Sequence, residues 1–290
     1  MDVTKLGVWY FFDGMPAADA ANAAQRIEQL GYGTLWIPET AGRNPMVLAS
    51  WLLGNTQTLN VATRIANIYH REPGVTVGAQ NALAEQSGNR FLLGIGVSHK
   101  PFVEGVRGLT YRPPVATMSD YLDKMAQAPY QSVPPSETPA TVIAALGPKM
   151  LALAKDKCDG AHPYFVSPDH TAMAREILGP DKLLCVEQKV ILETNASVAR
   201  AAARPAAQVY MALPNYRNNW LRMGMTEDDI DGAGSDKFID ATFAWGSVTQ
   251  IQSRIQQHFD AGADHVCIQP VNPNQQFGDL HWEALEALAP

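Results

Sequence analysis

The chain is poor in cysteine, with only three in 290 residues. Cys158, Cys185 and Cys267 are odd in number, lie far apart and include no Cys-x-x-Cys pair. They therefore argue against a disulfide framework and against a thiolate zinc site. Unpaired cysteines of this kind are typical of a reducing compartment, so we expect a cytoplasmic protein.

Positive charge and long apolar runs are also scarce. Lysine and arginine number 22 against 29 acidic residues, which gives a formal net charge of −7. This balance argues against nucleic acid or an anionic membrane as a partner, and we expect a small-molecule ligand instead. The apolar run at residues 6–12 is too short to cross a bilayer and has no small-residue cleavage site, so it predicts a first strand.

Strand-like and helix-like segments alternate along the chain. The strands are predicted at residues 6–12, 34–39, 59–69, 91–96, 141–146, 160–166, 183–192 and 265–271, with helices between them. Eight strands separated by helices favour an α/β fold of one domain over residues 1–290, a single (β/α)8 TIM barrel. A repeated glycine-capped junction at Gly31, Gly160 and Gly262 supports a ring, although such junctions also occur in open sheets.

Two connections are too long to be simple turns. Residues 100–116 follow the fourth strand and residues 213–243 follow the seventh helix, so we expect two insertions that form the wall of a binding site. Their aromatic side chains are candidate substrate contacts, although they could equally pack on the barrel or on a second subunit of a homodimer, which we also expect. With Phe12 at the end of the first strand, the candidates are Phe12, Tyr111, Tyr216 and Trp220.

The segment from Ser87 to His99 is the most informative stretch. A helix ends at Ser87, a short apolar strand follows, and the strand finishes with Gly94 and Gly96 before Ser98 and His99. Glycines at such positions indicate that the backbone comes close to another group. A dinucleotide fingerprint is not indicated, because the third glycine is missing and a proline-containing loop follows in place of a helix. A glycine-softened turn is the alternative.

Glu39 ends the second predicted strand. A carboxylate at the carboxyl end of a barrel strand is a candidate acid, base or hydrogen-bond acceptor for a bound ring. The alternative is an ion pair with Arg43 or Arg71 that only orders the rim of the barrel.

Three histidines follow three other strands: His70, His99 and His162. Together they predict a polar pocket at one end of the barrel, with His70 and His99 as candidate catalytic groups beside Glu39. No pair of them has metal-ligand spacing, so we expect no metal site.

A candidate anion site lies at residues 146–150. A strand ends, Gly147 allows the turn, Pro148 suits the first helical position and Lys149 stands in the first turn. Free N–H groups at a helix start attract anions such as phosphate. An ordinary helix start with a solvated lysine is the alternative.

Four stretches of the chain together resemble the luciferase-like monooxygenase superfamily. They are residues 82–97, residues 35–39 followed by Pro45, residues 144–150 and residues 160–164. The resemblance covers nearly the whole chain in the expected order and is greatest to the branch that depends on coenzyme F420. It implies a barrel that binds a flavin or the 5-deazaflavin F420 at the carboxyl ends of its strands.

The resemblance also implies roles for individual residues. Glu39 would lie beside the ring, and Asn67 with Ile68 would form a strained bulge at its back face. The remaining expected cofactor contacts are Gly96, Val97, Ser98, Leu146, Gly147, Pro148, Lys149, Met150, Ala161 and His162. Many F420 enzymes of this type carry a histidine directly after the acidic residue of the second strand, whereas this chain has Thr40, which leaves the proton donor open.

The implied function is an F420-dependent oxidoreductase that transfers a hydride between the cofactor and a small organic substrate. One alternative is an FMN-dependent monooxygenase, and another is a non-catalytic barrel that binds a flavin or deazaflavin. The anionic tail of F420 would need cations along its exit, for which Arg43, Arg71, Lys100 and Lys149 are the candidates.

Overall fold

A computed structural model describes residue 3, residues 6–274 and residues 280–290. Its centre is a closed ring of eight parallel strands, in which β10 pairs with both β1 and β8. In ring order the strands are β1 (Gly7–Trp9), β2 (Thr34–Ile37), β3 (Asn60–Thr63), β5 (Phe91–Gly96), β6 (Thr141–Ile143), β7 (Gly160–Ala161), β8 (Leu183–Leu192) and β10 (His265–Pro270). The predicted TIM barrel is confirmed, with each ring strand at a predicted position.

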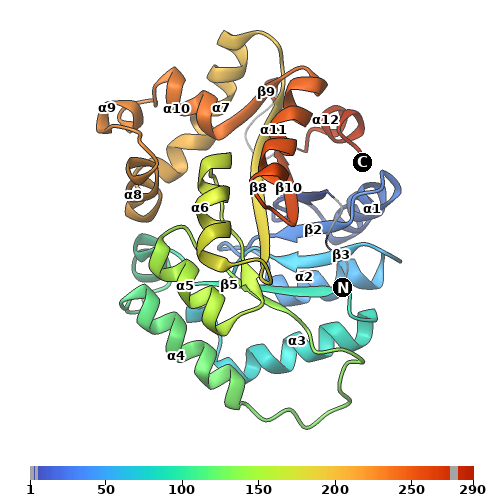
Figure 1. Ribbon diagram of the computed structural model, residues 1–290. Coiled ribbons are helices and arrows are strands. Elements are labelled where there is room, and N and C mark those ends of the chain that lie inside the picture. The colour runs from blue at the N-terminus through green and yellow to red at the C-terminus, as the bar shows by residue number, and fades with distance from the viewer. Residues whose placement is uncertain (1–2, 4–5, 275–279) are drawn as a thin grey trace.

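Helices surround this ring (Figure 1). They are α1 (Ala17–Gln29), α2 (Pro45–Gly54), α3 (Pro73–Ser87), α4 (Pro114–Gln127), α5 (Pro148–Lys157), α6 (Pro168–Leu178), α7 (Ala196–Met211), α11 (Val248–Asp260) and α12 (Trp282–Ala287). All five helices from α2 to α6 begin with proline, because the first helical position needs no N–H donor and suits the fixed φ of proline. Each such start follows the carboxyl end of a strand or its loop, so the helix N-termini gather at one end of the barrel.

The third predicted strand is divided in two. After β3 the chain passes a cis peptide bond between Arg64 and Ile65 and continues as β4 (Ala66–Asn67), which pairs with the far end of β5. The strained bulge expected at Asn67–Ile68 is not present at Asn67. Asn67 has ordinary extended angles, φ −76° and ψ 122°, because its side chain caps the short 3-10 helix η1 (Ile68–His70).

The two predicted insertions are present, and both are more regular than expected. Residues 101–106 form a short π-helical segment, η2 (Pro101–Val106). The second insertion folds as α8 (Pro214–Arg222), α9 (Glu227–Ile230) and α10 (Asp236–Thr242) and leads into an additional strand, β9 (Phe243–Gly246). Because Lys189 of β8 pairs with both β10 and β9, β9 lies on the edge of β8 opposite β10.

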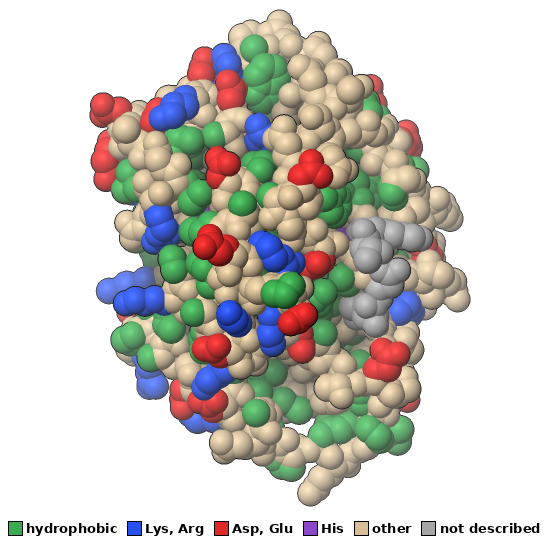
Figure 2. All heavy atoms as spheres, in the orientation of Figure 1, with side chains coloured by type: hydrophobic (Ala, Val, Ile, Leu, Met, Phe, Trp, Pro, Cys, Tyr) green, Lys and Arg blue, Asp and Glu red, His purple; other side chains and the backbone are tan. Residues whose placement is uncertain are grey.

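The buried apolar side chains form separate clusters. The largest fills the space between the ring and its helices, whereas a second lies under the inserted helices, around Phe165, Trp220 and Phe238. Acidic and basic side chains are interspersed on the face shown in Figure 2, without an extended patch of either sign. Within the described part of the chain, no helix is both long and apolar enough to span a bilayer.

Candidate functional site

A cavity of about 950 Å³ opens at the carboxyl ends of the strands. Its wall combines residues that follow several ring strands with residues of α8. Most of the residues singled out from the sequence line it: Glu39, Val97, Ser98, His99, Tyr111, Leu146, Gly147, Pro148, Lys149, Met150, His162 and Tyr216. The remaining candidates, Phe12, Asn67, Ile68, His70, Gly96, Ala161 and Trp220, lie outside this wall.

Gly96 acts on the cavity indirectly. A Cβ atom at this position would come within 2.8 Å of Ile65 Cγ1 and 3.2 Å of Ala144 Cβ, so the glycine makes room for the Ile65 side chain, which lines the cavity. Gly94 serves a closer approach still, since a Cβ there would meet the Thr63 carbonyl oxygen at 2.0 Å. The close approach expected at both glycines is therefore present, and the groups that come close belong to the neighbouring strand segments.

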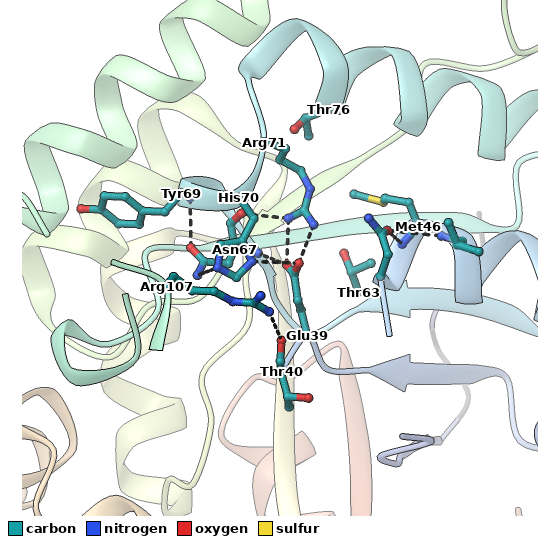
Figure 3. A network of polar contacts seen from close by, with 12 residues as sticks. Glu39, Thr40, Met46, Thr63, Asn67, Tyr69, His70, Arg71, Thr76 and Arg107 are labelled. Carbon is teal, nitrogen blue, oxygen red and sulfur yellow. Dashed lines mark hydrogen bonds and ion pairs between the residues drawn. The ribbon is translucent and has the colours of Figure 1, made fainter. Parts of the chain in front are cut away.

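Glu39 is held in a closed network of hydrogen bonds (Figure 3). Arg71 donates to its two carboxylate oxygens at 2.7 and 2.8 Å, and the Asn67 backbone N–H donates at 2.6 Å. Burial alone would raise the pKa of Glu39, but the Arg71 guanidinium and these donors outweigh it and hold the pKa below its usual range. The carboxylate is therefore an ionised anchor, in agreement with the ion-pair alternative involving Arg71.

His70 belongs to the same network. Asn67 Oδ1 accepts from the Tyr69 N–H, so the Asn67 amide nitrogen is the donor to His70 Nε2 at 3.1 Å. His70 Nδ1 must then carry the proton that it donates to Glu39 at 3.0 Å. Both ring nitrogens are occupied and the ring lies outside the cavity wall, so its geometry suits the ordering of residues 67–71 (Figure 3).

His99 is the candidate histidine that faces the cavity without such a network. It follows β5, directly after Ser98, whose φ of 53° is a left-handed conformation that side chains rarely adopt and that is often found at functional sites. Burial lowers the pKa of His99, although a hydrogen bond with Asn215 partly opposes this effect, so the ring is neutral at pH 7. A neutral imidazole at a cavity wall can both accept and donate a proton.

One end of the cavity carries positive charge. Pro148 and Lys149 begin α5, and Gly147 is its N-cap residue. Because glycine has no side chain, no side chain at the cap accepts a hydrogen bond from the N–H groups of the first turn. Arg222 of α8 joins them, with Nη2 3.9 Å from the position a Gly147 Cβ would take. Arg222 could not be predicted from the sequence, because it enters the site from the second insertion.

The other cations expected along the exit are placed differently. Arg71 is committed to Glu39, Arg43 donates to the Met15 carbonyl, and the Lys100 side chain is 68% exposed near Glu104. Of the four, only Lys149 lines the cavity.

Two aromatic candidates are core residues. The Trp220 indole is buried, donates to the Phe165 carbonyl at 3.2 Å and packs edge-on against Phe165 and Phe238. Phe12 is equally buried and packs edge-on against Tyr10, whereas its neighbour Phe11 lines the cavity. Because β1 ends at Trp9, strand alternation does not extend to Phe12, and the three preceding residues line the cavity instead.

Residues 3–265 match the luciferase-like monooxygenase family. The chain belongs to this family, which makes it an enzyme of the oxidoreductase class. A Mycobacterium tuberculosis protein named as a coenzyme F420-dependent oxidoreductase is 25% identical over 249 residues, 71% of each chain.

Solved structures of low sequence identity share the fold. The coenzyme F420-dependent tetrahydromethanopterin reductase of Methanopyrus kandleri aligns with a TM-score of 0.77 at 16% identity, over 100% of this chain and 98% of that one. The oxygenating constituent of 3,6-diketocamphane monooxygenase from Pseudomonas putida, a complex with FMN, aligns with a TM-score of 0.71 at 14% identity, over 99% and 96%. A deazaflavin or a flavin is thus the cofactor type found among the relatives.

Proposed function

We propose that this chain is an F420-dependent oxidoreductase that transfers a hydride between the deazaflavin ring and a small organic substrate. The observation that carries the proposal is the cavity of about 950 Å³ at the carboxyl ends of the strands, whose apolar walls lead to a helix start with Lys149 and Arg222 beside it. The named activity of the mycobacterial relative supports F420 over FMN.

The residues of the cavity fit such a cofactor. Ile65 and Val97 offer an apolar surface to one face of a flat ring, and aromatic side chains such as Phe102 and Tyr111 lie on the same wall. The first turn of α5, with Lys149, would hold the phosphate of the side chain, since helix N-termini favour anions.

When bound, the deazaflavin supplies the hydride donor or acceptor. The chain's own part is to hold the ring, exclude water and manage a proton. Glu39, paired with Arg71, keeps the segment after β4 in place and is a poor proton donor because it is ionised. His99 is the better candidate for proton transfer, since it is neutral and faces the cavity.

The cofactor is tested by titrating the purified protein with F420 and, separately, with FMN, following quenching of the ring fluorescence. We expect F420 to bind at least about tenfold more tightly than FMN. Tighter binding of FMN would support the monooxygenase alternative. Binding of neither ring would contradict the proposed function.

The reaction is tested by mixing the reduced F420 complex with a panel of carbonyl and unsaturated compounds and following the return of oxidised-cofactor fluorescence. With any compound that reacts, His99→Gln should slow turnover by about a hundredfold, in the range of general acid–base contributions, while leaving F420 affinity nearly unchanged. Unchanged turnover in this variant would remove His99 from the proton transfer.

A further inference from the structure

Arg64 lies at the buried end of the cavity and has no part in the function proposed above. It follows β3 directly, lines the cavity and is only 7% exposed. Its guanidinium carbon stands 4.0 Å above the centre of the Tyr164 ring, which also lines the cavity. A cationic side chain so deeply buried normally has an anionic partner.

The partner of Arg64 is instead neutral. Arg64 Nη1 lies 2.8 Å from His162 Nε2, and arginine can only donate, so Nε2 is the acceptor. His162 Nδ1 faces the Cys185 carbonyl and must therefore carry the ring proton. The imidazole is neutral in this arrangement, so it contributes a hydrogen bond to Arg64 and no negative charge.

The buried carboxylate of Glu187 is already compensated. Glu187 is fully buried, lies 3.2 Å from Lys189 Nζ and accepts the Phe165 N–H at 2.9 Å. Within the described residues Arg64 forms no ion pair with any carboxylate, and its Nε atom is buried without a hydrogen-bond partner. Counting the described residues, the interior of the barrel below the cavity therefore carries one positive charge in excess.

The groups around Arg64 lack acceptors as well. Trp9 packs on the same Tyr164 ring, with 5.9 Å between the ring centres, and its buried Nε1 has no hydrogen-bond partner. Gln269 Oε1, an acceptor at this end of the cavity, is taken by the Tyr164 hydroxyl at 2.8 Å. This end of the cavity has donors without acceptors.

We propose that Arg64 is the cation of a subsite for an anionic oxygen group at the closed end of the cavity. Two ligands share this chemistry: a substrate that carries a carboxylate or forms an enolate, and a cofactor ring with a deprotonated edge. If the ligand is the substrate, the subsite limits the substrate to organic acids and enolisable carbonyl compounds. This case rests on the proposed function. The existence of the subsite itself depends only on the chain.

The subsite is tested by calorimetric titration of the cofactor-free protein with benzoate and with benzamide, which differ in charge but share an aromatic ring suited to the cavity wall. We expect benzoate to bind at least about tenfold more tightly, as for a buried charged hydrogen bond. Arg64→Met should abolish the difference and Arg64→Lys should keep part of it. Arg107→Met is the matched control, because Arg107 is not part of the cavity wall and donates to the Thr40 carbonyl at 3.0 Å (Figure 3).

The proposal is overturned if the wild-type protein does not prefer benzoate, or if Arg64→Met keeps the preference. If Arg64→Met does not fold, Arg64→Lys decides, because an unchanged benzoate preference in that variant would assign the preference to the other cations of the cavity wall, Lys149 and Arg222, and would overturn the proposal. We expect Arg64→Met to fold, with an unchanged or higher melting temperature, because it removes an uncompensated buried charge.

A second titration separates the two ligands. Unchanged F420 affinity in Arg64→Met, together with loss of benzoate binding, assigns the subsite to the substrate. Weakened F420 binding in that variant, with competition between benzoate and F420 in the wild type, assigns it to the ring edge. If neither F420 nor FMN binds while the benzoate preference persists, the subsite stands and the proposed function fails.

Discussion

Replacing Glu39 with glutamine tests whether this residue anchors the barrel rim or takes part in chemistry. The side chains of Glu39 and Arg71 are only 6% and 7% exposed. Removing one partner of a buried pair leaves the other charge uncompensated, which typically costs about 3–5 kcal/mol. At about 2–4 °C per kcal/mol for a chain of this size, a loss of about 3 kcal/mol lowers the melting temperature by about 6–12 °C.

The same pair predicts a pH dependence with a definite sign. The folded-state pKa of Glu39 lies below its ordinary value of 4.5, so its contribution to stability is complete above that value. It is lost as the pH falls through the lower folded-state pKa. Wild-type stability should therefore decline on acidification in this window more steeply than the stability of Glu39→Gln.

Urea unfolding at pH 7 and along a series from pH 6 to pH 3 measures both effects. Glu104→Gln is the matched control, because Glu104 is 40% exposed and 3.8 Å from Lys100, and a surface pair of this kind contributes less than about 1 kcal/mol. The double variant Glu39→Gln, Arg71→Met should recover part of the loss. A cost below about 1 kcal/mol for Glu39→Gln, with an unchanged pH slope, would refute the anchoring role.

Three further changes test other parts of the molecule. Lys149→Glu should weaken F420 binding more at low than at high salt, because salt screens part of the charge attraction. Lys155→Glu, in the last turn of the same helix, is the control and should have little effect. Wild-type dissociation constants for Lys149→Glu at both salt concentrations would remove Lys149 from the site. Gly96→Ala should push Ile65 toward the cavity, lower the free energy of unfolding in urea by about 1–3 kcal/mol and reduce F420 affinity. Wild-type affinity and stability in this variant would show that the strands accommodate the extra methyl group. Burial lowers the pKa of His258 to about 3, so its contribution to the stability of the folded state should be lost as the pH falls from 6.5 toward 3. His258→Gln should therefore make stability less dependent on pH in this range. The same pH dependence in the variant and the wild type would contradict this assignment.

The fold could be predicted because its signals are local and repeated. Each strand of the ring is an apolar segment next to a helix with a glycine or proline boundary, and no long-range information is needed to recognise it. β9 was missed because it follows the short helices of the second insertion, whose lengths give little periodicity. The register at Phe12 failed for a similar reason, since β1 spans only Gly7–Trp9 and the chain leaves the strand before Phe12.

The site could be predicted where its residues directly follow strands and, for Tyr111 and Tyr216, from the aromatic residues of the two insertions. Glu39, His99 and Lys149 were found in the first way and all line the cavity. The sequence offered Arg43 and Arg71 as partners of Glu39 but could not choose between them, because the pairing with Arg71 depends on the turn after β4. It was silent on Arg64 as well, since nothing local distinguishes an arginine without an anionic partner from one that has such a partner.

The inserted helices have a consequence for how this enzyme could change its specificity. α8 supplies part of the cavity wall, including Tyr216, yet it rests on the cluster around Trp220 and Phe238, apart from the main core of the barrel. In Figure 1, α8, α9 and α10 gather at one corner of the molecule. Exchange of residues 213–242 between related barrels would therefore transplant a recognition surface together with its own support. Sequence changes in this insertion could therefore alter the cavity wall without refolding the eight-stranded barrel.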